Sequence, residues 1–171
     1  MSNNEVLEYI TKSFDLKRQG FYKPAIEMLY KALSIENNNV EILSQLGELY
    51  YLLENNQRAI SYIEKTLEID PLHIECLKLL KTIRMSEENY EEALKAVNKI
   101  FEINPTPSSL VDKIAVLNKL NRFDEIKELL RRKDLLNSLD DAPIHIPIMS
   151  LNDVPKLLLK QKRNIILQVS K

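Results

Sequence analysis

The chain has 171 residues, of which 44% are apolar and 29% charged, so it is long enough to bury a hydrophobic core. Its formal net charge of -1 gives no overall field that would attract nucleic acid or an anionic membrane. It holds two glycines and one cysteine. These counts argue against a glycine-rich phosphate-binding fold, an internal disulfide framework and a cysteine-based zinc cluster, and they favour an all-helical protein.

The beginning of the chain, MSNNEVLEYITKSF, lacks the basic and apolar regions of a secretory signal. No apolar run approaches the roughly 20 residues that a membrane span requires. We therefore expect a soluble cytoplasmic protein.

Small residues recur at a fixed interval along the chain. Ala25, Ala59 and Ala93 are 34 residues apart, and so are Pro71 and Pro105. Between these positions the apolar residues keep helical spacing. Each interval therefore predicts a helix, a short turn and a second helix, because a helix pair of this length is the unit of several repeat proteins.

The second repeat shows what the small residues do. Leu43, Leu46 and Tyr50 form one apolar side of its first helix, and Gly47 lies among them. Glycine weakens a helix by about 1 kcal/mol relative to alanine. We expect this weakness to be offset because Gly47 and Ala59 let the two helices approach closely. Glycine and asparagine, which favour turns, predict the turns between the helices of each pair, at Gly20, Asn55, Asn56, Asn89 and Asn121.

These residues resemble the signature of the tetratricopeptide repeat, Trp-x2-Leu-Gly-x2-Tyr on a first helix and Ala-x3-Phe followed by Pro on and after a second. The second repeat fits best, through Leu43, Leu46, Gly47, Tyr50, Ala59, Ile63 and Pro71. In the third, Lys81 and Arg84 replace Gly and Tyr, and the first departs most at Lys12. The resemblance implies an all-α fold, a right-handed superhelix of antiparallel helix pairs with a C-terminal capping segment.

We expect the array to span residues 3–139. The repeats are predicted at about residues 6–39, 40–73, 74–106 and 107–139. The fourth is degenerate, because Ile126 stands near the place of the alanine. Its second helix is expected to begin at FDEIKELL and to run on through RRKDLLNSL.

Prolines mark the end of the array. Pro143 and Pro147, with isoleucines between them, predict an extended linker over residues 140–151. Residues 152–171 carry more basic than acidic side chains and are expected to form a helix or strand that caps the array, lies in a groove, or acts as a basic tail. For residues 164–171 the sequence is compatible with either helix or strand.

The resemblance also implies where a partner binds. In related arrays the first helices of the pairs line a concave groove that holds an extended peptide or a helix of a partner protein. Carried over residue by residue, the groove positions are Leu7, Ile10, Phe14, Glu41, Gln45, Glu48, Leu52, Glu75, Lys78, Leu79 and Thr82.

The first helix is apolar on two sides. Tyr9, Ser13 and Leu16 are expected to face its partner helix, whereas Leu7, Ile10 and Phe14 have a helical spacing of their own. An exposed apolar patch often marks an interaction site. This side is therefore expected to bind a partner or a second copy of the chain, as in a homodimer.

The best-known groove chemistry of the family is a two-carboxylate clamp, in which basic and asparagine side chains hold the C-terminal aspartate of a heat-shock chaperone. The equivalent positions here are Ile10, Phe14, Gln45, Glu75 and Leu79. None is a cation, and Glu75 would repel a carboxylate, so the sequence argues against this ligand. Acidic and apolar groove residues suit a basic, apolar ligand instead, a character that the chain's own KLLLKQKR at residues 156–163 has.

No pattern predicts catalysis, a cofactor or a metal. His73 and His145 have no second ligand at metal spacing, and Cys76 is expected to be a packing residue. We expect a non-catalytic protein–protein interaction scaffold, or adaptor. The alternative is a structural subunit or homo-oligomeric element whose groove, or first-repeat patch, is covered by itself or by a neighbour.

Overall fold

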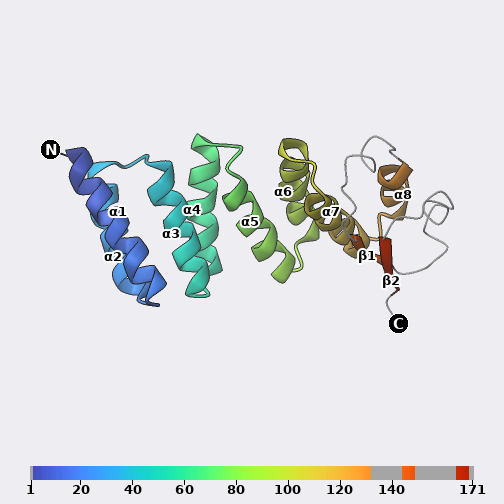
Figure 1. Ribbon diagram of the computed structural model, residues 1–171, viewed down its shortest axis with the longest axis horizontal. Coiled ribbons are helices and arrows are strands. Elements are labelled where there is room, and N and C mark those ends of the chain that lie inside the picture. Colours follow the sequence, from blue (N-terminus) through green and yellow to red (C-terminus); the bar gives the residue numbers. More distant parts are fainter. Residues whose placement is uncertain (1, 132–143, 149–164, 170–171) are drawn as a thin grey trace. The chain divides into compact units, whose positions relative to one another are not determined.

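The computed structural model describes residues 2–131, 144–148 and 165–169 (Figure 1). The chain divides into two compact units, unit 1 with residues 1–80 and unit 2 with residues 81–171. The division falls inside one helix, next to Lys81, the residue that replaces the signature glycine of the third repeat.

Unit 1 is built from helices joined by short turns. Its elements are α1 (Ser2–Arg18), α2 (Tyr22–Ile35), α3 (Val40–Leu52), α4 (Asn56–Ile69) and the first part of α5 (Ile74–Ser86). Helix α1 packs against α2, α2 against α3, and α3 against α4. Since short turns reverse the chain direction, these are the antiparallel helix pairs that the 34-residue period predicts.

The small residues of the repeats lie where helices meet. Ala25, Ala59 and Ala93 have no exposed surface. A Cβ atom added at Gly47 would lie 3.1 Å from Cγ1 of Ile63, tighter than ordinary van der Waals contact, and 3.5 Å from the carbonyl oxygen of Ala59. Glycine therefore allows the close approach of α3 and α4, as expected.

The turns within the helix pairs share one geometry. After the first helix of each pair comes a residue with a left-handed backbone, φ +83° at Gly20, 58° at Glu54, 56° at Glu88 and 56° at Asn121. The next residue donates its N–H to a carbonyl five residues back, as in Phe21 to Leu16 at 2.9 Å. This is the Schellman arrangement that closes a helix C-terminus.

Asparagine caps the second helix in two of the pairs. The side chain of Asn55 accepts a hydrogen bond from Arg58 N at 3.1 Å, and that of Asn89 accepts one from Glu92 N at 3.5 Å. Such a cap typically contributes about 1 kcal/mol. The predicted turn asparagines thus have a definite role at these two positions.

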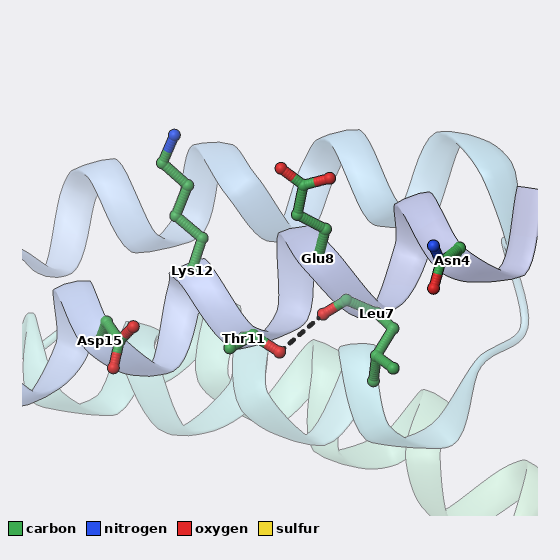
Figure 2. A pocket seen from close by; sticks show the side chains of 6 residues that line it. All are labelled: Asn4, Leu7, Glu8, Thr11, Lys12 and Asp15. Atoms are coloured by element: carbon green, nitrogen blue, oxygen red, sulfur yellow. Dashed lines mark hydrogen bonds between the residues drawn. The ribbon is translucent and has the colours of Figure 1, made fainter.

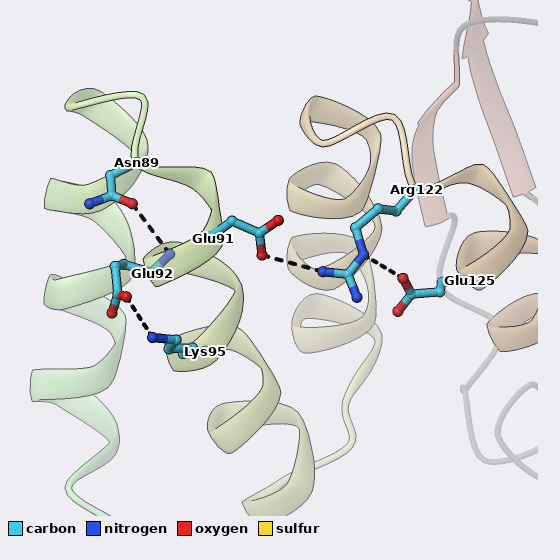
Figure 3. Close-up of polar contacts among 6 residues, drawn as sticks. All are labelled: Asn89, Glu91, Glu92, Lys95, Arg122 and Glu125. Carbon is cyan, nitrogen blue, oxygen red and sulfur yellow. Dashed lines mark hydrogen bonds and ion pairs between the residues drawn. The ribbon is translucent and has the colours of Figure 1, made fainter.

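Unit 2 contains the rest of α5 together with α6 (Tyr90–Ile103), α7 (Pro107–Lys119) and α8 (Phe123–Arg131). The apolar faces of α6, α7 and α8 form one core cluster that includes Val97, Ile114 and Leu117. Figure 3 shows an exposed polar link within this unit, in which Arg122 donates to Glu91 at 3.3 Å and also bonds Glu125. Hydrogen bonding to Glu125 raises the pKa of Arg122, so this link stays charged.

Two strands follow near the end of the chain. Strand β1 (Ile144–Ile148) pairs in parallel with β2 (Ile165–Val169), with Ile144 opposite Ile165, and β1 lies against α7. The stretch between the prolines is therefore extended, and residues 165–169 form a strand, which the sequence left open.

Other expectations for the tail fall outside the described residues. They are the continuation of the fourth repeat beyond Arg131, the linker at residues 140–143 and 149–151, and the helix or strand expected from residue 152, up to residue 164. The limits of the individual repeats stay predictions. Among the described residues, no helix is both long enough and apolar enough to cross a membrane.

Candidate functional site

The predicted groove residues fall on α1, α3 and α5, and all except Thr82 belong to unit 1. Exposed side chains among them are Leu7, Phe14, Glu41, Leu52, Glu75, Lys78 and Thr82. Glu48 and Leu79 are half-buried. Most of the predicted positions are thus accessible to a partner.

Two predicted positions are not accessible. Ile10 is 9% exposed because it lies on the same side of α1 as Val6 and Ser13, which are buried. Gln45 is 5% exposed, and its amide donates a hydrogen bond to Oε1 of Glu41 at 2.6 Å. The expected placement of Ile10 and Gln45 on an open surface is therefore wrong. Ile10 packs in the core, and Gln45 holds a neighbouring carboxylate.

A contiguous surface joins the C-terminal parts of α1 and α3. Nζ of Lys17 lies 2.7 Å from Oε2 of Glu48, and it lies 5.3 Å from the ring centre of Phe14. Leu52 follows Glu48 by one helical turn. Phe14 is 40% exposed and Leu52 39%. We call Phe14, Lys17, Glu48 and Leu52 the α1–α3 patch. The charges of Lys17 and Glu48 cancel each other, so the exposed surface that remains is mainly that of Phe14 and Leu52 and is apolar.

The N-terminal parts of these helices carry a different surface. Leu7, Glu41 and Glu75 occupy equivalent positions, 34 residues apart, on α1, α3 and α5. Leu7 is 60% exposed and, with Thr11 beside it, lines a shallow hollow on α1 that Glu8, Lys12 and Asp15 border (Figure 2). The hydroxyl of Thr11 donates to the backbone carbonyl of Leu7 at 2.8 Å. The side chain of Leu7 is the apolar part of the lining of this hollow.

The carboxylate of Glu75 is open to solvent, with its side chain 78% exposed. Nδ1 of His73 lies 3.7 Å from Oε2 of Glu75 and accepts a hydrogen bond from Cys76 N at 3.3 Å. His73 thus caps the start of α5. Within the described ranges no group of three or more His, Cys, Asp or Glu side chains is placed to hold a metal ion.

Cys76 lies in the core of unit 1, 3% exposed. Burial raises the pKa of its thiol to about 11. The thiolate is the reactive form of cysteine, so the folded protein holds Cys76 in an inert state. The expectation that it is a packing residue agrees with this placement.

A tyrosine cluster was not anticipated from the sequence. The hydroxyl of Tyr30 lies 2.8 Å from that of Tyr50 and 2.9 Å from that of Tyr62, and Arg58 donates to the Tyr50 hydroxyl at 2.9 Å. The rings of Tyr50 and Tyr62 stack with centres 5.6 Å apart. Burial raises the pKa of Tyr30 and of Tyr50, so both stay protonated at neutral pH and can share hydrogen bonds. The cluster ties α2, α3 and α4 together.

Comparisons with known proteins agree with this architecture. Residues 18–100 match the family described as "Anaphase-promoting complex, cyclosome, subunit 3". No curated protein matches the chain.

Solved structures with a similar fold include MamA from Desulfovibrio magneticus RS-1, with 20% identity, coverage of 77% of this chain and 75% of that one, and a TM-score of 0.66. MamA AMB-1 shows 21% identity, 75% and 71% coverage and a TM-score of 0.63.

A tetratricopeptide repeat protein from Parabacteroides merdae has a TM-score of 0.69 at 21% identity, over 78% of this chain and 54% of that one. At such identities these likenesses concern the fold. Taken with the 34-residue period, the paired helices and the close contact at Gly47, they show that the chain has the tetratricopeptide repeat fold.

Proposed function

We propose that this chain is a non-catalytic interaction scaffold whose unit 1 binds a basic and apolar segment of a partner protein along α1, α3 and the start of α5. The observation that carries the proposal is the exposure of Leu7, Phe14 and Leu52 on the first helices of successive pairs. Repeat arrays use such surfaces for binding.

The apolar side chains supply most of the binding free energy in this proposal. Leu7, Phe14 and Leu52 are 60%, 40% and 39% exposed. Burying the exposed part of each would contribute about 1 kcal/mol, at roughly 25 cal/mol per Å² of apolar surface. Three such contacts suit a moderate, reversible interaction.

The carboxylates select the sign of the ligand's charge. Glu48 is already paired with Lys17, whereas Glu41 and Glu75 present equivalent carboxylates on α3 and α5. Exposed ion pairs contribute at most about 1 kcal/mol each, so they influence specificity and association rate more than affinity. A segment with lysines or arginines flanking leucines matches both features.

A direct test uses the peptide KLLLKQKR, the sequence of residues 156–163, carrying a fluorescent label. The full chain should bind it saturably in a fluorescence anisotropy titration, more weakly as salt is added. The charge-reversed peptide ELLLEQEE should not bind. Equal binding of both peptides, or no binding of KLLLKQKR, would contradict the proposal.

Matched variants locate the site. Phe14→Asp places a charge in the α1–α3 patch and should weaken peptide binding at least tenfold. Ile69→Asp is the control, because Ile69 is also exposed, at 47%, but lies at the end of α4. Its affinity should stay within about twofold of the original. Loss of binding in both variants would point to general damage instead of a site on α1.

A second candidate function is that of an assembly element. It is favoured by Leu7 and Phe14, which lie exposed on the first helix of the chain. In that case light scattering after size-exclusion chromatography should show a dimer that Phe14→Asp converts to monomer. A monomer at all concentrations would leave the scaffold as the better account.

A further inference from the structure

The turn of the first helix pair lacks the side-chain cap that the second and third pairs have. Phe21, Asn55 and Asn89 each precede the second helix of a pair, with φ, ψ of -83°, 66°, then -94°, 72°, then -85°, 68°. The backbone is thus nearly the same in all three. Asn55 and Asn89 cap the following helix through their side chains, whereas Phe21 makes no such bond.

Core packing does not compensate for the missing cap. The side chain of Phe21 is 54% exposed, while Phe101 in unit 2 is 7% exposed. Position 21 therefore lacks the stabilising hydrogen bond and leaves a large aromatic side chain on the surface. Residues that break a local rule without a structural gain are often retained for function.

The position of Phe21 relates it to the α1–α3 patch. It follows the end of α1 after Gly20, and its N–H bonds to the carbonyl of Leu16 at 2.9 Å. Phe14 lies about one turn before the end of α1, and Leu52 is the last residue of α3. The Lys17–Glu48 ion pair links these two helix ends. Three exposed apolar side chains thus lie at the same end of unit 1.

We propose that Phe21 extends the α1–α3 patch and contacts the apolar part of the bound segment, an inference that rests on the proposed function. The occupant is the leucine-bearing stretch of a basic partner segment. Its basic residues then point towards Glu41 and Glu75, at the other ends of their helices. Glu41 and Leu52 are eleven residues apart on α3, or about 16 Å along the helix, which an extended peptide spans in about five residues.

This arrangement gives the ligand a direction and a minimum length. The leucines of the ligand lie at the turn end, over Phe14, Phe21 and Leu52. Its positive side chains lie at the other end, near Glu41 and Glu75, where Leu7 offers a further apolar contact. The charge of the Lys17–Glu48 pair is balanced, so the patch itself favours uncharged side chains.

Phe21→Asn tests the proposal because it should move stability and binding in opposite directions. Restoring the cap should raise the melting temperature by about 2–4 °C. Removing the aromatic ring should weaken the affinity for labelled KLLLKQKR at least fivefold. Phe21→Leu is the control, since it keeps an apolar side chain without a cap and should retain affinity within about threefold.

The outcomes separate this inference from the proposed function. An unchanged peptide affinity in Phe21→Asn, with binding lost in Phe14→Asp, would overturn the role of Phe21 and leave the groove standing. A lower melting temperature in Phe21→Asn would also overturn it, because Phe21 would then be structural. If neither variant changed the affinity, the proposed function itself would fail.

Discussion

The two units treat their apolar side chains differently. Within residues 4–131, the large hydrophobic side chains that are exposed all lie in unit 1, namely Leu7, Phe14, Phe21, Tyr30, Ile35, Leu52, Ile69 and Leu72. The described helices of unit 2 have none, and most of their buried apolar side chains belong to one cluster. Unit 1 therefore has apolar surface available for a partner, whereas the described helices of unit 2 expose no large hydrophobic side chain.

The signature positions differ in the same way. In unit 1, Gly47 gives close contact between α3 and α4. In unit 2 the equivalent residue is Lys81, whose Nζ lies 2.8 Å from Oδ2 of Asp112. Arg84, in place of the signature tyrosine, pairs with Glu87 at 3.0 Å. Charged side chains thus take over two positions that serve close packing in the second repeat.

The largest expected effect comes from paired core truncations. Leu46 in unit 1 and Leu117 in unit 2 are 0% and 1% exposed. Leu46→Ala and Leu117→Ala should each lower the free energy of unfolding by about 2–5 kcal/mol. Hydrogen exchange should show the main loss of protection in the unit that carries the change. Equal losses in both units would mean that the chain opens as one body.

Cys76 gives an independent readout of unit 1, because it is the one cysteine of the chain. Its pKa rises from 9.0 to about 11 through burial. At pH 8 the folded protein should react with an aromatic disulfide reagent at least about 100-fold more slowly than the unfolded chain. Leu46→Ala should speed this reaction much more than Leu117→Ala. Rapid labelling of the unaltered chain would contradict the burial of Cys76.

The same raised pKa sets a pH dependence. The unfolded thiol loses its proton at lower pH than the folded one, so the unfolded state binds fewer protons above pH 9. The contribution of Cys76 to stability is therefore complete below about pH 9 and is lost as the pH rises towards about 11. Chemical denaturation of the original chain and of Cys76→Ala should diverge over that window.

Two buried serines provide a smaller comparison. Ser109 in unit 2 accepts from Thr106 N at 2.9 Å and donates to the carbonyl of Asn104 at 2.8 Å. Oγ of Ser13 in unit 1 is buried without a hydrogen-bond partner among the described residues. Ser109→Ala should cost about 1–2 kcal/mol, whereas Ser13→Ala should be neutral or stabilise by up to about 1 kcal/mol. Similar destabilisation by both in thermal unfolding would refute this difference.

The smallest effects concern the ion pairs. Lys17–Glu48 and Lys81–Asp112 join first helices within unit 1 and unit 2. Lys17→Met and Lys81→Met should each cost under about 1 kcal/mol, since one partner in each pair is partly exposed. Only Lys17→Met should lower the affinity for KLLLKQKR, by up to about threefold, because it leaves the charge of Glu48 unbalanced beside the leucines of the bound segment. An equal loss from Lys81→Met would place the peptide elsewhere.

The sequence predicts the repeats because their small residues mark the places where two helices come into close contact. Ala25, Ala59 and Ala93 recur at fixed intervals and are fully buried, and at Gly47 an added Cβ atom would lie 3.1 Å from Ile63. Two of the turns are predictable as well, since Gly20 and Asn121 favour left-handed backbone, whereas Glu54 and Glu88 adopt it without that preference.

The site is predictable only in part. Ile10 has helical spacing both with Leu7 and Phe14 and with Val6 and Ser13, and periodicity alone does not say which side faces the core. In the structure, Ile10 packs in the core on the same side as Val6 and Ser13.

Non-local pairing explains the other gaps. Tyr30, Tyr50 and Tyr62 occupy non-equivalent places in their repeats, so no sequence period connects them. Residues 165–169 become a strand through pairing with Ile144–Ile148, a contact that a local pattern does not contain.

Hydrogen exchange of the full chain, measured with and without saturating KLLLKQKR, tests the central claim most directly. We expect slower amide exchange in α1, α3 and the turn at Phe21, with α6, α7 and α8 unchanged. Slower exchange confined to unit 2, or bound peptide with no change in α1 and α3, would contradict a partner-binding surface on unit 1.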